Sequence, residues 1–186
     1  MVDPSAGIGR SHRGYWLSMA ALVVALPAAL AAQSWEDVRA WRAQHGREPV
    51  PAAVGQAIDY AGARWTVTRL TRLAGGQGHA VVLAEFEAAT ADPQAAGSSP
   101  CQVLLADGDG RTWQPVLFAD PAVRKTYPEA EERSLCGGPA FAAAAPGKPA
   151  LMAASFTVPA SARDLTLSIA MLTALPAYLS VSEPRQ

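Results

Sequence analysis

The chain has few cysteines, histidines and lysines, and this scarcity excludes several classes of protein. It contains two cysteines and three histidines among 186 residues and has no C-x-x-C pair, so a zinc-finger type of site is not expected. Its two lysines and its formal net charge of −1 at pH 7 argue against a basic surface for nucleic acid. No G-x-S-x-G motif is present, and His79 is the only histidine after residue 54. We therefore predict no metal, no cofactor, no nucleic-acid partner and no enzymatic activity.

One long apolar run lies near the N-terminus, from Tyr15 to Gln33, and it contains no charged residue. A helix of this length rises about 28 Å, close to the ~30 Å hydrocarbon core of a bilayer. Tyr15 and Trp16 at one end, and Trp35 just beyond the other, suit the aromatic belts at membrane interfaces. The run predicts a transmembrane helix at residues 15–33, with the lipid bilayer as its partner and residues 1–14 as a disordered cytoplasmic tail.

Two other interpretations of the apolar run stay open. Arg10, His12 and Arg13 precede it as a basic region, and Ala29–Ala31 has the A-x-A pattern of a cleavage site, as in a secretory signal peptide. A buried helix of a soluble protein is the third interpretation. Because the anchor and the signal peptide both send the remaining chain across the membrane, we expect a single-pass cell-membrane protein with an extracytoplasmic C-terminal domain.

The two cysteines, Cys101 and Cys136, both follow the apolar run. One pair of cysteines in an extracytoplasmic domain is most simply a disulfide. Closing a loop of about 35 residues contributes roughly 3–4 kcal/mol in the chain-entropy model. Two unpaired buried thiols are the alternative.

Residues 34–54 connect the apolar run to the rest of the chain. Ser34–His45 predicts a short juxtamembrane helix, because Glu36 and Asp37 suit its first turn and Gly46 suits its end. Residues 47–53, with two prolines, predict an extended linker.

From residue 55 the apolar pattern changes to the period of two that is typical of strands. The pattern predicts an all-β domain at 55–182, an antiparallel immunoglobulin-like β-sandwich of seven or eight strands, and a C-terminal tail at 183–186. Few β-branched residues occur in 119–149, where we expect one helical turn at Ala130–Leu135. The expected strands are Ala57–Tyr60, Arg64–Leu73, His79–Glu87, Cys101–Ala106, Arg111–Leu117, Leu151–Val158, Asp164–Met171 and a short edge strand at Tyr178–Val181.

Two glycine-rich segments resemble ligand loops but are better explained as turns. Asp107–Gly110 offers two carboxylates for Ca²⁺, yet Asp-Gly is also a common hairpin pair, and no further acid follows at the required spacing. Gly75–Gly78 has the composition of a phosphate loop, but a strand rather than a helix follows it. We predict a hairpin turn at both places.

The remaining candidates are aromatic and acidic side chains. Trp65 and Trp113 could serve as platforms for a sugar, but alternation places them in the core. Glu129, Glu131 and Glu132 lie in one acidic run, which predicts a solvated surface rather than a pair of catalytic acids.

Four short motifs follow one another in the domain: Gly55, Tyr60, Gly62, Trp65 and Val67; Leu105 to Pro115; Pro146 and Gly147; and Phe156 to Pro159. This order, over about 130 residues, resembles membrane-anchored immunoglobulin-like β-sandwich domains of uncharacterised bacterial cell-envelope proteins. Many members of that group are exported or are lipoproteins, and this chain departs from the lipoprotein members because no cysteine directly follows the apolar run to accept a lipid. The resemblance implies a fold and a location, not a reaction.

The combined expectation is a non-catalytic accessory or protein-binding module of the cell envelope, with an envelope or secreted protein as partner. The alternative is a secreted small-ligand or glycan-binding module that is released by signal-peptide cleavage.

Overall fold

A computed structural model describes residues 14–17, 19–27, 47–76, 78–117 and 120–184. The chain divides into two units, Met1–His45 and Gly46–Gln186. In the first unit, residues 14–17 and 19–27 are helical. No helix among the described residues has both the length and the apolar character needed to cross a membrane. Residues 1–13 of the predicted tail at 1–14, residues 18 and 28–33 of the predicted span, and the predicted juxtamembrane helix lie outside the described residues. Gly14, the last residue of the predicted tail, is helical.

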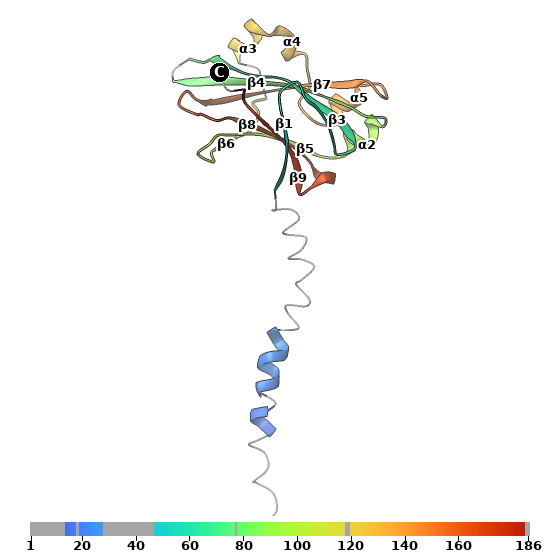
Figure 1. Cartoon of the computed structure of the whole chain (residues 1–186), viewed down its shortest axis with the longest axis vertical. Coiled ribbons are helices and arrows are strands. Elements are labelled where there is room, and N and C mark those ends of the chain that lie inside the picture. The colour runs from blue at the N-terminus through green and yellow to red at the C-terminus, as the bar shows by residue number, and fades with distance from the viewer. Residues whose placement is uncertain (1–13, 18, 28–46, 77, 118–119, 185–186) are drawn as a thin grey trace, which may run out of the picture. The chain divides into compact units, whose positions relative to one another are not determined.

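The second unit is a sandwich of two β-sheets (Figure 1), as the alternating pattern predicts. One sheet has the order β2-β3-β4-β7, and the other has the order β1-β9-β8-β5-β6. All neighbouring strands are antiparallel except β1 and β9, which are parallel. The strands are β1 (Glu48–Ala52), β2 (Ala57–Tyr60), β3 (Ala63–Ala74), β4 (His79–Ala89), β5 (Cys101–Ala106), β6 (Thr112–Trp113), β7 (Pro149–Pro159), β8 (Thr166–Met171) and β9 (Ala177–Ser182).

Short helices fill the connections between the sheets. Each of the four α-helices has a proline in its first turn, where the missing N–H breaks no helical bond. Asp92 and Asp120 cap α2 and α3 by accepting hydrogen bonds from Ala95 N and Ala122 N. Figure 1 shows α3 and α4 over the outer face of the four-stranded sheet, and α2 beside α5 at one end. The helices are α2 (Pro93–Ser98), α3 (Pro121–Thr126), α4 (Pro128–Glu131), α5 (Gly138–Ala142) and the 3₁₀ turn η1 (Leu172–Ala174).

The main core lies between the two sheets and is centred on Trp65 of β3. This side chain is 1% exposed, and its ring contacts the rings of Phe86 and Phe141 at centroid distances of 6.4 and 6.2 Å. Alternation along β3 directs Trp65 and Val67 inward, and a bulge between Val67 and Arg69 then brings Leu70 into the core.

A smaller apolar cluster lies on the outer face of the four-stranded sheet, beneath α3 and α4. It explains why β4 is apolar on both faces along much of its length. Its buried members are Val81, Leu83, Val123, Ala130 and Ala153.

The predicted linker at residues 47–53 is wrong, because β1 occupies Glu48–Ala52 and pairs with β9. Glu48 N donates a hydrogen bond to Pro176 O at 3.0 Å. The backbone N–H groups of successive residues in a strand point to opposite sides. Because the N–H of Glu48 points to β9, the nitrogens of Pro49 and Pro51 point away from β9, and no hydrogen bond between the two strands is lost. The prolines are therefore compatible with a strand at this position, and the compact unit begins at Gly46 rather than at residue 55.

Other boundaries also differ from the prediction. Strand β6 covers only Thr112–Trp113 instead of Arg111–Leu117, since Pro115 cannot donate to a ladder. The predicted loop at 89–100 contains α2, and the region 119–149 contains three helices rather than one turn. Eight strands, β2 to β9, lie within the predicted domain at 55–182 and agree with the predicted seven or eight, while β1 precedes it.

Candidate functional site

The connection between β6 and β7, residues 114–148, is attached to both sheets. Cys136 forms a disulfide with Cys101 at the start of β5, which confirms the predicted pair. Ala153 N of β7 donates to Ser134 O at 3.2 Å. The short segment 134–136 therefore links β5 of the five-stranded sheet to β7 at the edge of the four-stranded sheet.

A buried carboxylate lies under this connection. Glu85 of β4 is 2% exposed, and its Oε2 and Oε1 form ion pairs with Arg69 Nη1 at 2.6 Å and Arg133 Nη1 at 2.8 Å. Oε1 accepts no hydrogen bond, so the charge of Arg133 is what compensates it. The Arg69 guanidinium also lies 4.2 Å from the centre of the Tyr127 ring, and its Nη1 lies 3.5 Å from Glu129 Oε1. These contacts fix the α3–α4 segment on the sheet.

A hollow of about 480 Å³ opens beside this ion cluster, between the α3–α4 segment and β7. Eight of its twelve lining residues have apolar side chains, although its accessible surface is more polar than apolar. Leu117 and Leu135 in this lining are 82% and 38% exposed. We call this space the lateral hollow. Its lining residues are Leu83, Val116, Leu117, Val123, Arg124, Ala130, Glu131, Arg133, Leu135, Ala153, Ala154 and Ser155.

Two polar groups of the lateral hollow have unused hydrogen-bonding capacity. Ser155 is 7% exposed, and among the described residues its hydroxyl has no hydrogen-bond partner. The Arg133 side chain is 25% exposed and is paired only with Glu85 among these residues, through Nη1. By contrast, Arg124 Nη1 lies 4.0 Å from Glu131 Oε1, and both side chains are half exposed. The hollow therefore combines an apolar wall with a fixed guanidinium and a free hydroxyl.

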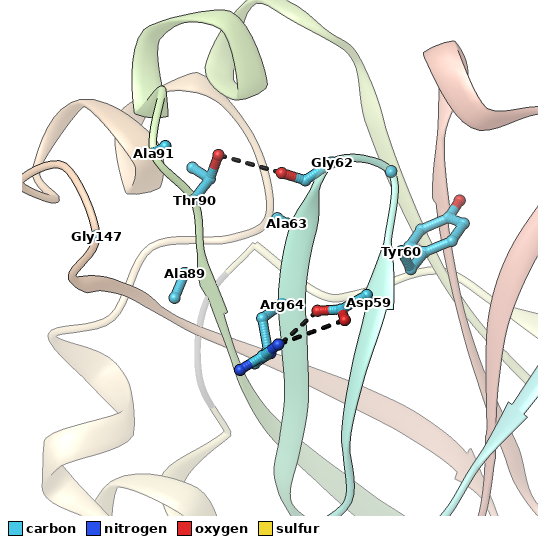
Figure 2. A pocket seen from close by; sticks show the side chains of 10 residues that line it. Asp59, Tyr60, Gly62, Ala63, Arg64, Ala89, Thr90, Ala91 and Gly147 are labelled. Atoms are coloured by element: carbon cyan, nitrogen blue, oxygen red, sulfur yellow. Dashed lines mark hydrogen bonds and ion pairs between the residues drawn. The ribbon is translucent and has the colours of Figure 1, made fainter.

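A second, wider depression of about 610 Å³ lies at the β2–β3 hairpin (Figure 2). Its charged residues, Asp59 and Arg64, pair with each other at 3.0 Å, and both are largely exposed. Thr90 Oγ1 donates to Gly62 O at 3.3 Å, so this hydroxyl is also engaged within the protein. Its lining contains no histidine, cysteine or serine. The lateral hollow is the better candidate site, because the Ser155 hydroxyl and the remaining N–H donors of Arg133 have no partner among the described residues.

The Asp107–Gly110 turn is confirmed, and its first carboxylate is occupied by the turn itself. Asp107 Oδ1 accepts from Asp109 N at 3.1 Å and from Arg111 N at 2.9 Å, and Oδ2 accepts from Arg111 Nε at 2.7 Å. Burial raises the pKa of Asp107, but the hydrogen bonds and the charge of Arg111 outweigh it, so the pKa is lowered. These contacts give the carboxylate a structural role.

The other residues singled out by sequence are dispersed. Trp65 is in the core, and its Nε1 donates to Tyr60 O at 3.0 Å, whereas Trp113 is half-buried against the same core. Neither ring is an exposed platform. His79 begins β4, which pairs with β3 as an antiparallel hairpin, as predicted; residue 77 of the connecting loop lies outside the described residues. Glu129, Glu131 and Glu132 are exposed, as the acidic run predicts.

Glu85, Arg133 and Ser155 are not predicted as site residues from the sequence. Glu85 lies on the same face of β4 as Val81 and Leu83, and a single charge on an otherwise apolar face is a signal that could have identified it. No local pattern distinguishes Arg133 or Ser155, since their roles depend on contacts between segments distant in sequence.

The chain matches no protein-family model and no curated protein. Among solved structures it is similar to an uncharacterised β-sandwich protein from Clostridium difficile 630, at 10% identity and a TM-score of 0.46 over 74% of this chain and 96% of that one. It is also similar to the yjhA protein from Bacillus subtilis, at 14% identity and a TM-score of 0.42 over 71% of this chain and 98% of that one. A conserved hypothetical protein from Bacillus anthracis is similar at 13% identity and a TM-score of 0.40, over 64% and 88% of the two chains. The assignment to the β-sandwich class rests on the two sheets of this chain itself.

Proposed function

We propose that this chain is a single-pass, membrane-anchored protein whose β-sandwich lies outside the cytoplasm and serves as a non-catalytic, protein-binding accessory of the cell envelope. The observation that carries the proposal is the exposed apolar surface of the N-terminal helical residues. Trp16, Leu17 and Val24 there are 66%, 72% and 69% exposed. Leaving such side chains in water instead of an apolar environment costs about 1.5–3 kcal/mol each, so a bilayer is a favourable partner for them.

The disulfide between Cys101 and Cys136 supports an extracytoplasmic location for the second unit. Disulfides form and persist in oxidising compartments, and they are rare in the cytosol, where thiols are kept reduced. A protein that crosses the membrane once would carry this domain into a compartment where the bond is stable.

The strand order supports an immunoglobulin-like sandwich as the type of fold. Strands β3-β4-β7 form one sheet, and β9-β8-β5 form the other, with β1 parallel to β9 at the edge. Consecutive chain segments cross between the sheets after β4 and after β7. This arrangement corresponds to the ABE and GFC strands of immunoglobulin domains, whose end loops commonly bind other proteins.

A secreted small-ligand-binding module is the second candidate function. The lateral hollow favours it, because it has the size of a ligand site and contains unpaired polar groups. A glycan is less favoured as the ligand, since Trp65 is buried and Trp113 is half-buried.

Cell fractionation with mass measurement of the purified chain tests the anchor. Full-length protein should stay in the membrane pellet after carbonate extraction and keep its N-terminal residues. Replacing Leu22 and Val23 with aspartate should release it, whereas Leu172→Asp, at an exposed leucine of the sandwich, should not. A soluble chain that begins near Ala32 would select the secreted alternative. An intact chain recovered from the cytosol would reject both.

A further inference from the structure

We propose that the lateral hollow binds a small amphipathic monocarboxylate, an acyl chain that ends in a carboxylate, with the carboxylate held by Arg133 and Ser155. All lining residues belong to the second unit, so this site does not depend on whether the chain is anchored. The size of the hollow, about 480 Å³, lies within the usual range of roughly 300–1,000 Å³ for small-ligand sites.

Arg133 is held in position before any ligand arrives. Its Nη1 is paired with the buried carboxylate of Glu85, which fixes one side of the guanidinium. Arg133 lines both this hollow and a neighbouring depression over Glu85. A guanidinium presents five N–H donors in a planar fork that matches a carboxylate. Because the side chain is already three-quarters buried and oriented, little rotamer freedom remains to be lost on binding.

The charges around the hollow favour no more than a single negative group. Arg69 and Arg133 both pair with the buried Glu85, and Arg69 also lies 3.5 Å from Glu129, while Arg124 lies 4.0 Å from Glu131. These three arginines and three glutamates balance, so a bound carboxylate adds one negative charge, whereas a dianion would add two beside Glu131.

Ser155 adds a hydroxyl to the hollow. Its residue is 7% exposed, and its hydroxyl has no hydrogen-bond partner among the described residues. Glu85 Oε1 is the one enclosed side-chain atom without a partner in this part of the chain, so the Ser155 hydroxyl is open to the hollow rather than enclosed. A carboxylate oxygen in the hollow would accept the hydroxyl proton in a hydrogen bond.

The apolar wall accounts for the acyl part of the ligand. Leu83, Val123 and Ala153 are buried and line the hollow, while Leu117 and Leu135 stand exposed in the same lining. A small polar anion would leave these leucines in water, whereas an alkyl chain would cover them. The same hollow thus offers contacts for both ends of an amphipathic molecule.

Calorimetric titration of the full-length chain in lipid nanodiscs with octanoate tests this site, with empty nanodiscs as the reference. Octanoate should bind saturably, and at least about tenfold more tightly than 1-octanol, which lacks the charge, or acetate, which lacks the chain. A peptide ending in leucine with a free carboxylate should bind less tightly than octanoate. Equal binding of octanoate and 1-octanol, no octanoate binding, or tighter binding of the peptide would overturn the proposal.

Three variants localise the binding. Ser155→Ala and Arg133→Lys should each weaken octanoate binding by about fivefold or more. Ser155→Ala removes the hydroxyl that would donate to the carboxylate. Arg133→Lys removes the planar guanidinium but keeps a positive charge beside Glu85. Leu117→Glu places a negative charge at an exposed wall of the hollow and should abolish binding, whereas Leu172→Glu is its exposed control. If Arg133→Lys does not fold, the other two variants decide. Unchanged octanoate binding in both of them would overturn the proposal.

Discussion

The hydroxyl of Tyr60 accepts a hydrogen bond from the backbone amide of Met171 at 2.9 Å, and this bond joins the two sheets. The same hydroxyl donates to Ala177 O at 3.0 Å. Tyr60 ends β2 in one sheet, while Met171 ends β8 and Ala177 begins β9 in the other. Burial raises the pKa of Tyr60, and the bond from Met171 offsets only part of this rise.

Replacing Tyr60 with phenylalanine should lower the free energy of unfolding by about 1–3 kcal/mol, because the buried amide of Met171 would lose its partner. Urea unfolding measures the change. Tyr178→Phe is the matched control, since the Tyr178 hydroxyl makes no hydrogen bond within the described residues. Equal losses in the two variants would show that the hydroxyl of Tyr60 has no special role.

The Glu85–Arg133 pair should show strong coupling. Arg133→Met leaves a buried carboxylate with one partner and should cost about 3 kcal/mol, whereas the double variant with Glu85→Met should cost less. Arg124→Met, at an exposed pair, should cost under about 1 kcal/mol. Chemical denaturation of the natural chain, the two single variants, the double variant and Arg124→Met gives the comparison. Additive losses from Glu85→Met and Arg133→Met would contradict the coupling.

Asp107 should make stability depend on acid pH. Its pKa is lowered below the ordinary value of 3.8, so its stabilising contribution is present above that value and is lost as pH falls through the lower folded-state pKa. The advantage of the natural chain over Asp107→Asn should therefore shrink steadily below about pH 4. Thermal melts across this range measure it. Asp109→Asn, at a carboxylate that is 79% exposed, should show a much smaller effect.

Ala61 adopts a left-handed backbone conformation, with φ of 51°, in the turn between β2 and β3. Asparagine tolerates this conformation better than alanine, so Ala61→Asn should raise the free energy of unfolding by about 0.5–1 kcal/mol. Ala57→Asn, at an exposed position of the neighbouring strand, should give no gain. Urea unfolding of the two variants distinguishes relief of the turn from a general effect of asparagine.

Removing the disulfide with Cys101→Ala and Cys136→Ala should lower the free energy of unfolding by about 3–4 kcal/mol. Hydrogen exchange should accelerate most in residues 120–136, because the bond holds this segment against the five-stranded sheet. Protein treated with a reductant should behave like the double variant. Unchanged exchange in the segment would mean that the ion pairs with Glu85 suffice to hold it.

Much of the sandwich could be predicted from local patterns. Alternation gave β5 at its observed bounds, Cys101–Ala106, and located β3 and β4 to within two residues. The disulfide followed from there being only two cysteines. Strand β1 was missed because its prolines break a strand pattern unless their nitrogens face away from the neighbour, and this direction is set by β9. Helices α3 and α4 are too short for a periodic signal and are held by packing on the sheet.

The candidate site was less predictable than the fold. Glu85 was visible as a charge on an apolar face, but its partners Arg69 and Arg133 come from different segments. The hydroxyl of Ser155 lines a hollow only because α3 and α4 pack beside β7, the strand that carries this residue. Such a site depends on tertiary contacts, which one-dimensional patterns do not encode.

The two prolines of β1 also affect how this protein behaves in a crowded environment. An unprotected outer strand can template the addition of a neighbouring molecule, which begins aggregation. On the outward side of β1, Pro49 and Pro51 have backbone carbonyl groups but no N–H groups. A strand from another molecule could therefore donate hydrogen bonds to these residues but accept none from them. The five-stranded sheet therefore stops growing at this border, and many copies can be concentrated on one surface without joining into fibres through it.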